Sequence, residues 1–303
     1  MRLRIGILSG TFDPVHLGHL HVARVCLERM ALDKVLLLPF GKPLARVPEA
    51  GPAHRLRMLQ LAAQGIPGLE ISGMDVRKTP RYAVDTVAQL KKEYPSAGLV
   101  YIVGADKAPD IPAWQDAASL FQMCRVAVYP RAGYDAQAMV SFLSGHGADA
   151  TLLDSPLLTM SSGQIRAQLR LLSDAPGMLD PVVAEYIAAE GLYQPDFERM
   201  VRQSVSPARL VHSLGVRRTG ARLARLHGVP MQKVGVAGIL HDCAKSMELS
   251  RLQAIARQAR ITRDPQTLRS NALLHGPVGA HLARTRYHIS DAHILSAIAC
   301  HTT

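Results

Sequence analysis

The stretch GTFDPVHLGH, residues 10–19, lies between a short apolar run and an amphipathic run. The apolar run LRIGILS predicts a buried strand, and residues 17–30 predict a helix with one buried face. The stretch therefore leads from a strand end into a helix N-terminus, where backbone N–H groups can bind an anion. His16 and His19 can lie on one side of that helix, and Gly18 allows close backbone approach. Two imidazoles at this place can bind phosphate oxygens or simply cap the helix.

Short apolar runs alternate with amphipathic runs through the first part of the chain. We expect further strands at 34–40, 98–104, 125–130 and 150–154, and helices at 54–64, 83–94, 114–123 and 162–172. This alternation favours an α/β fold with a Rossmann-like, doubly wound parallel sheet. Ligands of such sheets bind beyond the carboxyl ends of the strands, and residues 10–19 lie there.

No strand pattern follows residue 194. Amphipathic runs separated by Gly, Pro or Ser-Asp breaks predict helices at 208–228, 231–242, 249–260, 277–288 and 291–301. We therefore expect an α/β domain of residues 1–194 and an all-α domain of residues 195–303. A chain of 303 residues is long enough to bury a core in each.

Positive charge is concentrated in the helical part. From Arg199 onward there are 16 Lys and Arg against 4 Asp and Glu, whereas the preceding residues have 19 against 20. Such a surface favours a polyanionic partner, either a nucleic acid or a nucleotide polyphosphate, unless it is only a solvated face. The Arg-rich run 209–225 lacks the interleaved aromatic residues of single-strand binders, which counts against nucleic acid.

Cysteine spacing and hydropathy indicate the cellular compartment in which the protein is expected. Cys26, Cys124, Cys243 and Cys300 are far apart and form no C-x-x-C pair, so we expect reduced thiols and a cytoplasmic location. No apolar run approaches the ~20 residues of a membrane span, and the first apolar run is too short for the core of a signal peptide. The sequence is compatible with a monomer or an oligomer.

Residues 10–19 resemble the signature of the nucleotidyltransferases that carry an H-x-G-H motif. Members transfer a nucleoside monophosphate from ATP to an acceptor phosphate and release pyrophosphate. MSSGQIR, residues 160–166, resembles their second motif, with Gly163 in place of the usual Thr. The resemblance implies Mg²⁺ that accompanies ATP and catalytic roles for Thr11, His16, His19 and Arg166. It implies ATP contacts from Gly10, Thr11, His16, Gly18, His19, Ser161, Ser162, Ile165 and Arg166.

Between these motifs the chain is similar to the bacterial nicotinate-nucleotide adenylyltransferase family. RYAVDT at 81–86, GAD at 104–106 and Trp114 carry this similarity. It implies that Gly104 and Asp106 contact ATP and that Trp114 stacks on the pyridine ring of nicotinate mononucleotide, although Trp is also a common core residue. The implied substrate-binding residues are Lys42, Tyr82, Ala83, Asp85, Thr86 and Trp114. Another acceptor, such as phosphopantetheine, is the alternative for the same fold.

Three histidines and a His-Asp pair are spread over the expected helices of the last third. They resemble the metal ligands of the HD-superfamily phosphohydrolases, which lie on facing helices of a bundle. The resemblance implies a metal site of His212, His241, Asp242, His275 and His301. Iron, manganese or zinc suits these donors, and Lys245 is the implied phosphate contact. LLHG and HTT resemble the subfamily that splits diadenosine tetraphosphate into two ADP.

The HD motif of that superfamily ends with an Asp some way after the last His, and this sequence has none after His301. We therefore expect the second domain to be incomplete and to hydrolyse little. The alternative is that the basic bundle acts only as a binding module for nucleic acid or nucleotide.

Overall fold

A computed structural model describes residues 2–40, 47–74, 82–157 and 159–302. The chain forms two compact units, one of Met1–Ile165 with Gly177–Asp180 and one of Arg166–Pro176 with Pro181–Thr303. By packing, the chain therefore passes into the second unit before residue 194. The division into functional domains after residue 194 stays a prediction.

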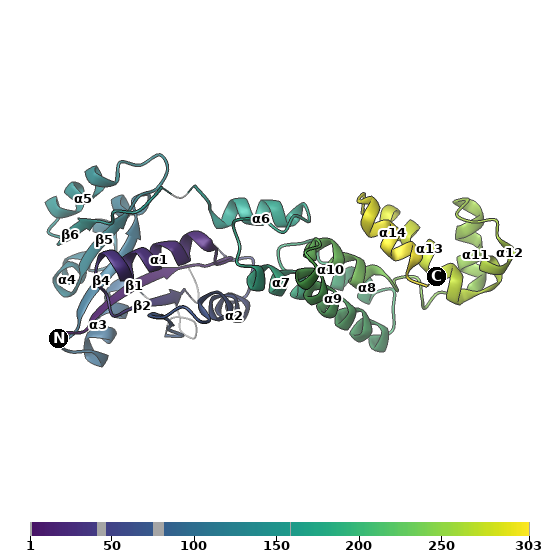
Figure 1. Ribbon diagram of the computed structural model, residues 1–303, viewed down its shortest axis with the longest axis horizontal. Helices are drawn as coiled ribbons and strands as arrows, with labels where there is room; N and C mark the ends of the chain where they lie inside the picture. The colour runs from purple at the N-terminus through teal and green to yellow at the C-terminus, as the bar shows by residue number, and fades with distance from the viewer. Residues whose placement is uncertain (1, 41–46, 75–81, 158, 303) are drawn as a thin grey trace. The chain divides into compact units, whose positions relative to one another are not determined.

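Six strands of the first unit form one parallel sheet in the order β3-β2-β1-β4-β5-β6 (Figure 1). The strands are β1 (Arg4–Gly10), β2 (Lys34–Pro39), β3 (Leu69–Ile71), β4 (Gly98–Gly104), β5 (Arg125–Tyr129) and β6 (Ala150–Leu152). The predicted doubly wound parallel sheet is confirmed. We did not predict β3, because three residues are too few to show a strand period.

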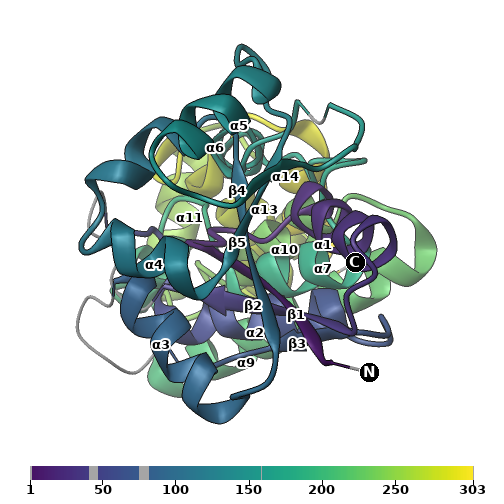
Figure 2. The ribbon, with the colours of Figure 1, turned by 90° about the vertical axis from the view of Figure 1, so that its left-hand side faces the viewer.

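Helices cover both faces of this sheet. They are α1 (Leu17–Arg29), α2 (Pro52–Ala63), α3 (Ala83–Glu93), the 3₁₀ helix η1 (Ala108–Ala113), α4 (Ala117–Met123) and α5 (Ala136–Gly145). α1 lies on the face opposite α3 and α4 (Figure 2). On the latter face Val87, Leu120 and Leu143 share one apolar core with Ile7 and Tyr101 of the sheet. The strand order reverses between β1 and β4, so a ligand is expected at the carboxyl ends of these two strands.

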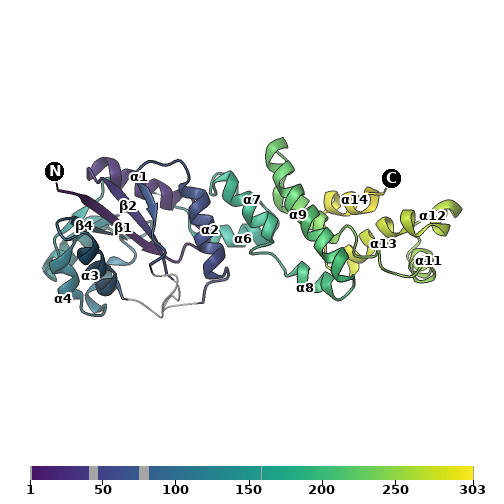
Figure 3. The same ribbon diagram turned by 90° about the horizontal axis from the view of Figure 1, so that it is seen from below.

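The second unit is helical in its described residues (Figure 3). α6 (Ser162–Arg170) begins in the first unit, and the helices after it are α7 (Pro181–Glu190), α8 (Phe197–Arg202), α9 (Pro207–His227), α10 (Met231–Leu240), α11 (Leu249–Gln258), α12 (Pro265–Arg269), α13 (Asn271–Thr285) and α14 (Ala292–Cys300). α10 is central, since Val236 and Ile239 pack in one core with Ile294 and Ile298 of α14. The predicted all-α architecture is confirmed.

Two helix boundaries differ from the prediction in ways that matter for the histidines. α13 begins at Asn271, six residues before the start that we place at Pro277, because the Ser270 hydroxyl caps it by accepting from the Leu273 N–H over 3.3 Å. His275 therefore lies within a helix. α10 ends at Leu240, so that His241 is its C-cap.

Other short helices, α5, α7, α8 and α12, lie in stretches for which we predict no element, since few residues in each carry a helical period. Among the described residues, no helix is both long and apolar enough to cross a bilayer.

Candidate functional sites

The loop that follows β1 is held from two sides. The Asp13 carboxylate accepts hydrogen bonds from the backbone N–H groups of Glu49 and Ala50 over 2.8 and 3.0 Å. On the other side, the Ser162 hydroxyl donates to the Pro14 carbonyl over 2.9 Å. The second sequence motif is thereby brought against the first, and the start of α1 has a fixed position.

His16 and His19 form a stacked pair at the N-terminus of α1. Their ring centroids are 3.7 Å apart, and the rings are inclined by 27°. The backbone N–H of His16 donates to Nδ1 of His19 over 3.2 Å. Because Nδ1 accepts this bond, a neutral His19 carries its proton on Nε2 and can donate it to a ligand oxygen.

Both imidazoles are neutral at physiological pH. Burial, and then the charge of Arg131, lower the pKa of His16 to about 4. Burial, then His16 and Arg131, hold the pKa of His19 well below its ordinary value. Nδ1 of His16 is buried and has no hydrogen-bond partner among the described residues. A buried polar atom without a partner is expected in a site where a bound ligand provides the missing hydrogen bond.

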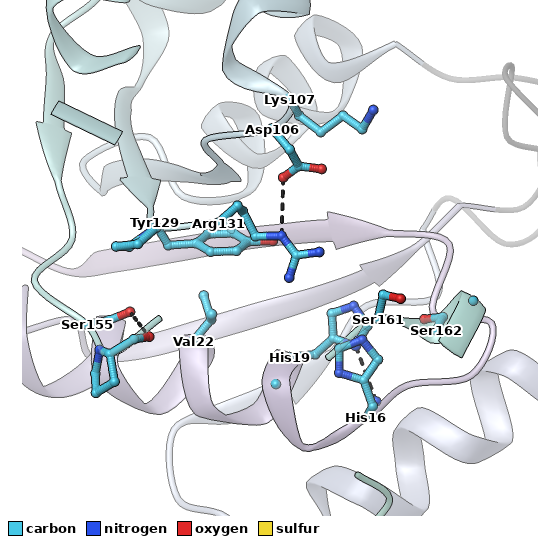
Figure 4. A pocket seen from close by; sticks show the side chains of 14 residues that line it. His16, His19, Val22, Asp106, Lys107, Tyr129, Arg131, Ser155, Ser161 and Ser162 are labelled. Atoms are coloured by element: carbon cyan, nitrogen blue, oxygen red, sulfur yellow. Dashed lines mark hydrogen bonds and ion pairs between the residues drawn. The ribbon is translucent and has the colours of Figure 1, made fainter. Parts of the chain in front are cut away.

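The two histidines line a pocket of about 330 Å³ (Figure 4). Lys107 and Arg131 bring positive charge to it, and Nε of Arg131 lies 3.4 Å from the Asp106 carboxylate. Ser161 and Ser162 lie beside the histidines at the N-terminus of α6. Imidazole, hydroxyl and cationic groups around one cavity favour a polyphosphate ligand.

The pocket contains part of the predicted ATP site. Its lining includes the predicted residues His16, Gly18, His19, Asp106, Ser161 and Ser162, and does not include Gly10, Thr11, Gly104 or Ile165. The structure still explains why residue 104 is a glycine, since a Cβ at Gly104 would lie only 3.1 Å from side-chain atoms of both Tyr129 and Arg131. Arg166 belongs by packing to the helical unit. The roles assigned to these residues stay predictions.

Sequence reasoning missed the four lining residues Lys107, Tyr129, Arg131 and Ser155, which all carry polar side chains. Lys107 comes three residues after the end of β4, and Arg131 two residues after the end of β5. The rule that ligands lie beyond the carboxyl ends of parallel strands was the signal that could have found them.

Trp114 is half-buried directly after η1. Its ring meets the edge of Tyr101 with centroids 5.9 Å apart and an interplanar angle of 77°. The Tyr101 hydroxyl in turn is hydrogen-bonded to Ser9 near the end of β1 over 2.5 Å. The indole is therefore fixed near the switch point of the sheet, although its predicted stacking partner stays a prediction.

The predicted substrate residues at the start of α3 form its N-terminal cap. The Tyr82 N–H donates to the Asp85 carboxylate over 3.3 Å, and the Thr86 hydroxyl donates to the Tyr82 carbonyl over 3.4 Å. Ala83 is the first residue of the helix. A helix N-terminus at this position can attract a carboxylate. Lys42, the other predicted substrate residue, lies outside the described residues.

In the helical unit, the predicted metal ligands come together around Asp242, whose side chain is only 5% exposed. One carboxylate oxygen lies 3.3 Å from His241 Nε2 and 3.8 Å from His212 Nε2. The other lies 3.2 Å from His275 Nε2 and 3.4 Å from His301 Nε2. The five residues thus form two triads that share Asp242.

The histidines present one nitrogen each to this centre. The Nδ1 atoms of three rings face backbone carbonyls, His241 that of Gly238 at 2.8 Å, His275 that of Asn271 at 2.9 Å and His301 that of Ile298 at 2.7 Å. A carbonyl only accepts, so each Nδ1 carries a proton and each neutral ring offers a lone pair on Nε2. The Nε2 atoms of His275 and His301, which both offer lone pairs, lie 3.0 Å apart, and those of His212 and His241 lie 3.2 Å apart. A cation bound between the lone pairs of His275 and His301 would remove their repulsion, so the residues fit a metal.

Arg209 is a further member that sequence reasoning missed. Its guanidinium donates to Asp242 over 2.8 Å from the first turn of α9. Although burial opposes ionisation, the neighbouring His241 and His275 and the charge of Arg209 hold the pKa of Asp242 far below its usual range. Nζ of Lys245 lies 3.5 Å from His275 Nδ1, at the edge of the centre. The carboxylate is therefore ionised and oriented.

Comparisons with known proteins agree with the first site. A model of the family described as cytidylyltransferase-like matches residues 7–168. The chain belongs to the cytidylyltransferase-like family. A probable nicotinate-nucleotide adenylyltransferase of Thermomicrobium roseum is 38% identical over 196 residues, covering 63% of this chain and 92% of the relative. One of Chromobacterium violaceum is 35% identical over 212 residues, covering 64% of this chain and 100% of the relative.

A solved structure shares the fold of this cytidylyltransferase-like region. It is the Plasmodium falciparum nicotinic acid mononucleotide adenylyltransferase complexed with NaAD, with a TM-score of 0.54 and 16% identity. The match covers 63% of this chain and 97% of that chain.

The helical region matches the HD domain model over residues 209–303. One relative extends over both parts of the chain. It is a probable nicotinate-nucleotide adenylyltransferase/Ap4A hydrolase of Mycoplasma pneumoniae, 25% identical over 299 residues, covering 98% of this chain and 82% of the relative. The chain thus combines a cytidylyltransferase-like domain with an HD domain.

Proposed function

We propose that the α/β unit transfers the adenylyl group of ATP to nicotinate mononucleotide. The products are nicotinate adenine dinucleotide and pyrophosphate. The observation that carries this proposal is the pocket in which His16, His19, Lys107 and Arg131 converge at the switch point of the sheet. The identity of the acceptor is inferred from the names of the relatives, which are probable nicotinate-nucleotide adenylyltransferases.

In the reaction, an oxygen of the acceptor phosphate forms a bond to the α-phosphorus of ATP. The bond from that phosphorus to the bridging oxygen of the β-phosphate breaks, and pyrophosphate leaves with the electron pair. The acceptor phosphate is already ionised, so no side chain is needed as a base. His19 Nε2–H, the α1 N-terminus, Lys107 and Arg131 stabilise the negative charge on the phosphates.

Mg²⁺ fits this site as the counter-ion of ATP. The pocket lining offers one carboxylate, Asp106, and Arg131 lies against it. Mg²⁺ that arrives with a nucleotide keeps several waters and needs few protein ligands. When bound, it shields charge on the triphosphate.

The acceptor would lie toward Trp114. An indole fixed by Tyr101 offers a flat face for a pyridine ring, and the N-terminus of α3 offers a place for the nicotinate carboxylate. This arrangement favours the acid over the amide mononucleotide.

Pyrophosphate release with ATP and each acceptor tests the proposal. We expect release with nicotinate mononucleotide, less with nicotinamide mononucleotide and none with phosphopantetheine. His19→Ala should lose about 2.7–4 kcal/mol of transition-state stabilisation, as for one oxyanion-hole donor. His146→Ala, an exposed histidine on the same unit, is the control. Turnover with phosphopantetheine alone would contradict the proposed acceptor.

We also propose that the HD unit hydrolyses a phosphoanhydride bond of a dinucleoside polyphosphate, with diadenosine tetraphosphate as the candidate. The printed name of the Mycoplasma pneumoniae relative and the two triads around Asp242 support this proposal. Imidazole and carboxylate donors suit iron, manganese or zinc. A metal bound there lowers the pKa of water and supplies a nucleophile. Arg209 and Lys245 would meet the substrate's phosphates.

The test incubates the full chain with diadenosine tetraphosphate and Fe²⁺ or Mn²⁺ and follows ADP. Asp242→Asn should abolish metal-dependent hydrolysis, whereas Asp264→Asn, an exposed carboxylate of the same unit, should not. A filter-binding salt titration with single-stranded nucleic acid covers the alternative. Tight salt-dependent binding without hydrolysis would favour a binding module.

A further inference from the structure

Gly215 lies in the middle of α9, where the packing of the fold does not require a glycine. Glycine weakens a helix interior because it has more backbone freedom to lose. A Cβ at Gly215 would meet no atom within 4 Å. Gly220 on the same helix differs, since a Cβ there would lie 2.9 Å from Val234 Cγ1. The fold needs Gly220 for close packing, but it leaves open space above Gly215.

This open space is part of a groove along α9. The groove has a volume of about 460 Å³, within the roughly 300–1,000 Å³ of small-molecule sites. Its lining is Val211, His212, Gly215, Val216, Thr219, Gly220 and Leu223. Val211 is 69% exposed and Leu223 is 49% exposed, so two large apolar side chains border it without being covered. Thr219 adds an exposed hydroxyl.

The groove is continuous with the metal centre through His212. The Nε2 of that residue lies 3.2 Å from His241 Nε2 and 3.8 Å from the Asp242 carboxylate. The half-exposed ring also lines the groove, and Gly215 lies one helical turn further along. A molecule whose phosphate lies at the metal centre would therefore extend over Gly215.

The chemistry of the groove selects one kind of occupant. A floor without a Cβ, bordered by aliphatic side chains, accepts a flat apolar ring, and the Thr219 hydroxyl can bond a ring edge or a sugar hydroxyl. Arg209 at the centre and the exposed Arg222 on α9 suit the phosphates of the same molecule. These features together match a nucleoside that carries a polyphosphate.

We propose that the α9 groove binds the nucleoside of a nucleoside polyphosphate, with the base over Gly215. The proposal rests on the phosphohydrolase function proposed above and deepens it. It makes Gly215 the residue that gives the HD unit its selectivity for a nucleoside over a bare polyphosphate.

Gly215→Phe tests this directly, because its Cβ would meet no atom within 4 Å and its ring would occupy the groove. Diadenosine tetraphosphate and inorganic tripolyphosphate are compared as substrates of the full chain with Mn²⁺. We expect the variant to raise KM for diadenosine tetraphosphate at least tenfold and to leave cleavage of tripolyphosphate unchanged. Gly145→Phe is the matched control, since Gly145 ends a helix of the other unit and its added Cβ also meets nothing.

Each outcome decides the matter. Equal loss with both substrates would make Gly215 a support of the metal centre, and no loss with either would leave the groove without a ligand. Both results overturn the proposal while the phosphohydrolase function stands. A parent chain that cleaves neither substrate removes the proposed function and this inference with it. A dimer that Gly215→Phe converts to a monomer would make the groove a protein interface instead.

A binding measurement gives a second readout that does not depend on turnover. Backbone amide resonances of the uniformly labelled chain are followed during titration with ADP and, separately, with inorganic phosphate. ADP should shift the amides of 216–223, away from the metal centre, and phosphate should not. Gly215→Phe should abolish this effect of ADP on 216–223. ADP shifts confined to the first unit would overturn the proposal.

Discussion

Nη1 of Arg55 donates a hydrogen bond to the backbone carbonyl oxygen of Thr11 over 2.8 Å, although 44 positions separate the two residues. Arg55 is fully buried on α2, and its Nε donates to the Ala50 carbonyl over 3.2 Å. Ala50 in turn donates to the Asp13 carboxylate. One guanidinium thus ties α2 to the loop that leads into the stacked histidines, without lining their pocket.

Arg55→Met should therefore loosen that loop. We expect the free energy of unfolding to fall by about 1.5–3 kcal/mol for each lost hydrogen bond of the charged group, and kcat to fall more than KM for ATP rises. Chemical denaturation and adenylation kinetics measure the two effects. Arg57→Met, at an exposed position on the same helix, is the control. Unchanged kinetics in a stable Arg55→Met chain would show that the loop holds its geometry by itself.

The pH dependence of stability should report the buried His16. Its pKa is about 4 in the folded protein and 6.5 in an unfolded chain, so between these values the unfolded chain takes up a proton that the folded one does not. Stability from this residue is complete above pH 6.5 and is lost as the pH falls toward 4. The loss is on the order of 3 kcal/mol at 1.36 kcal/mol per pKa unit. Denaturation of the parent and of His16→Gln from pH 4 to 7 measures it; parallel curves would contradict the assignment.

Much of the first site could be read from the sequence, because short-range patterns carry it. The strand, loop and helix around residues 10–19 are local, and so is the N-terminus of α6 that carries Ser161 and Ser162. The contribution of Arg55 could not be read, since its contact with Thr11 joins two segments that lie 44 positions apart in the chain. An isolated arginine has no periodic or spacing signal.

The helical unit shows the same division. The His-Asp pair and the three other histidines were found through their resemblance to the HD-superfamily metal ligands, and the structure places the four histidines around the carboxylate of Asp242. Arg209 was not found because its contact with Asp242 spans 33 positions and joins α9 to the turn that follows α10. The start of α13 was misplaced because Pro277 suggested a first helical turn, whereas the Ser270 cap begins the helix earlier and Pro277 lies inside it.

Trp114→Ala tests the assignment of the acceptor site. We expect KM for the pyridine nucleotide to rise far more than KM for ATP, since lost ring stacking is worth about 0.5–1.5 kcal/mol beyond buried area. Trp114→Phe, which keeps a flat ring, should restore most of the affinity. Steady-state kinetics with each substrate varied in turn measures the split. Equal effects on both KM values would make Trp114 a packing residue against Tyr101.

The two triads around Asp242 make a prediction about metal stoichiometry. Because each carboxylate oxygen faces its own histidine pair, the centre should hold up to two divalent ions. His275→Ala removes one triad and should lower the bound Mn²⁺ to one ion, whereas Asp242→Asn should abolish binding at both. Equilibrium dialysis with metal analysis gives the number of bound ions, and His293→Ala, an exposed histidine of the same unit, serves as the control.

Metal binding should also release protons from any charged imidazole, because a ligating Nε2 must be deprotonated. If the parent chain binds a single ion that His275→Ala retains, then His275 and His301 lie beside the metal centre without ligating, and the pair of His212 and His241 holds the metal with Asp242.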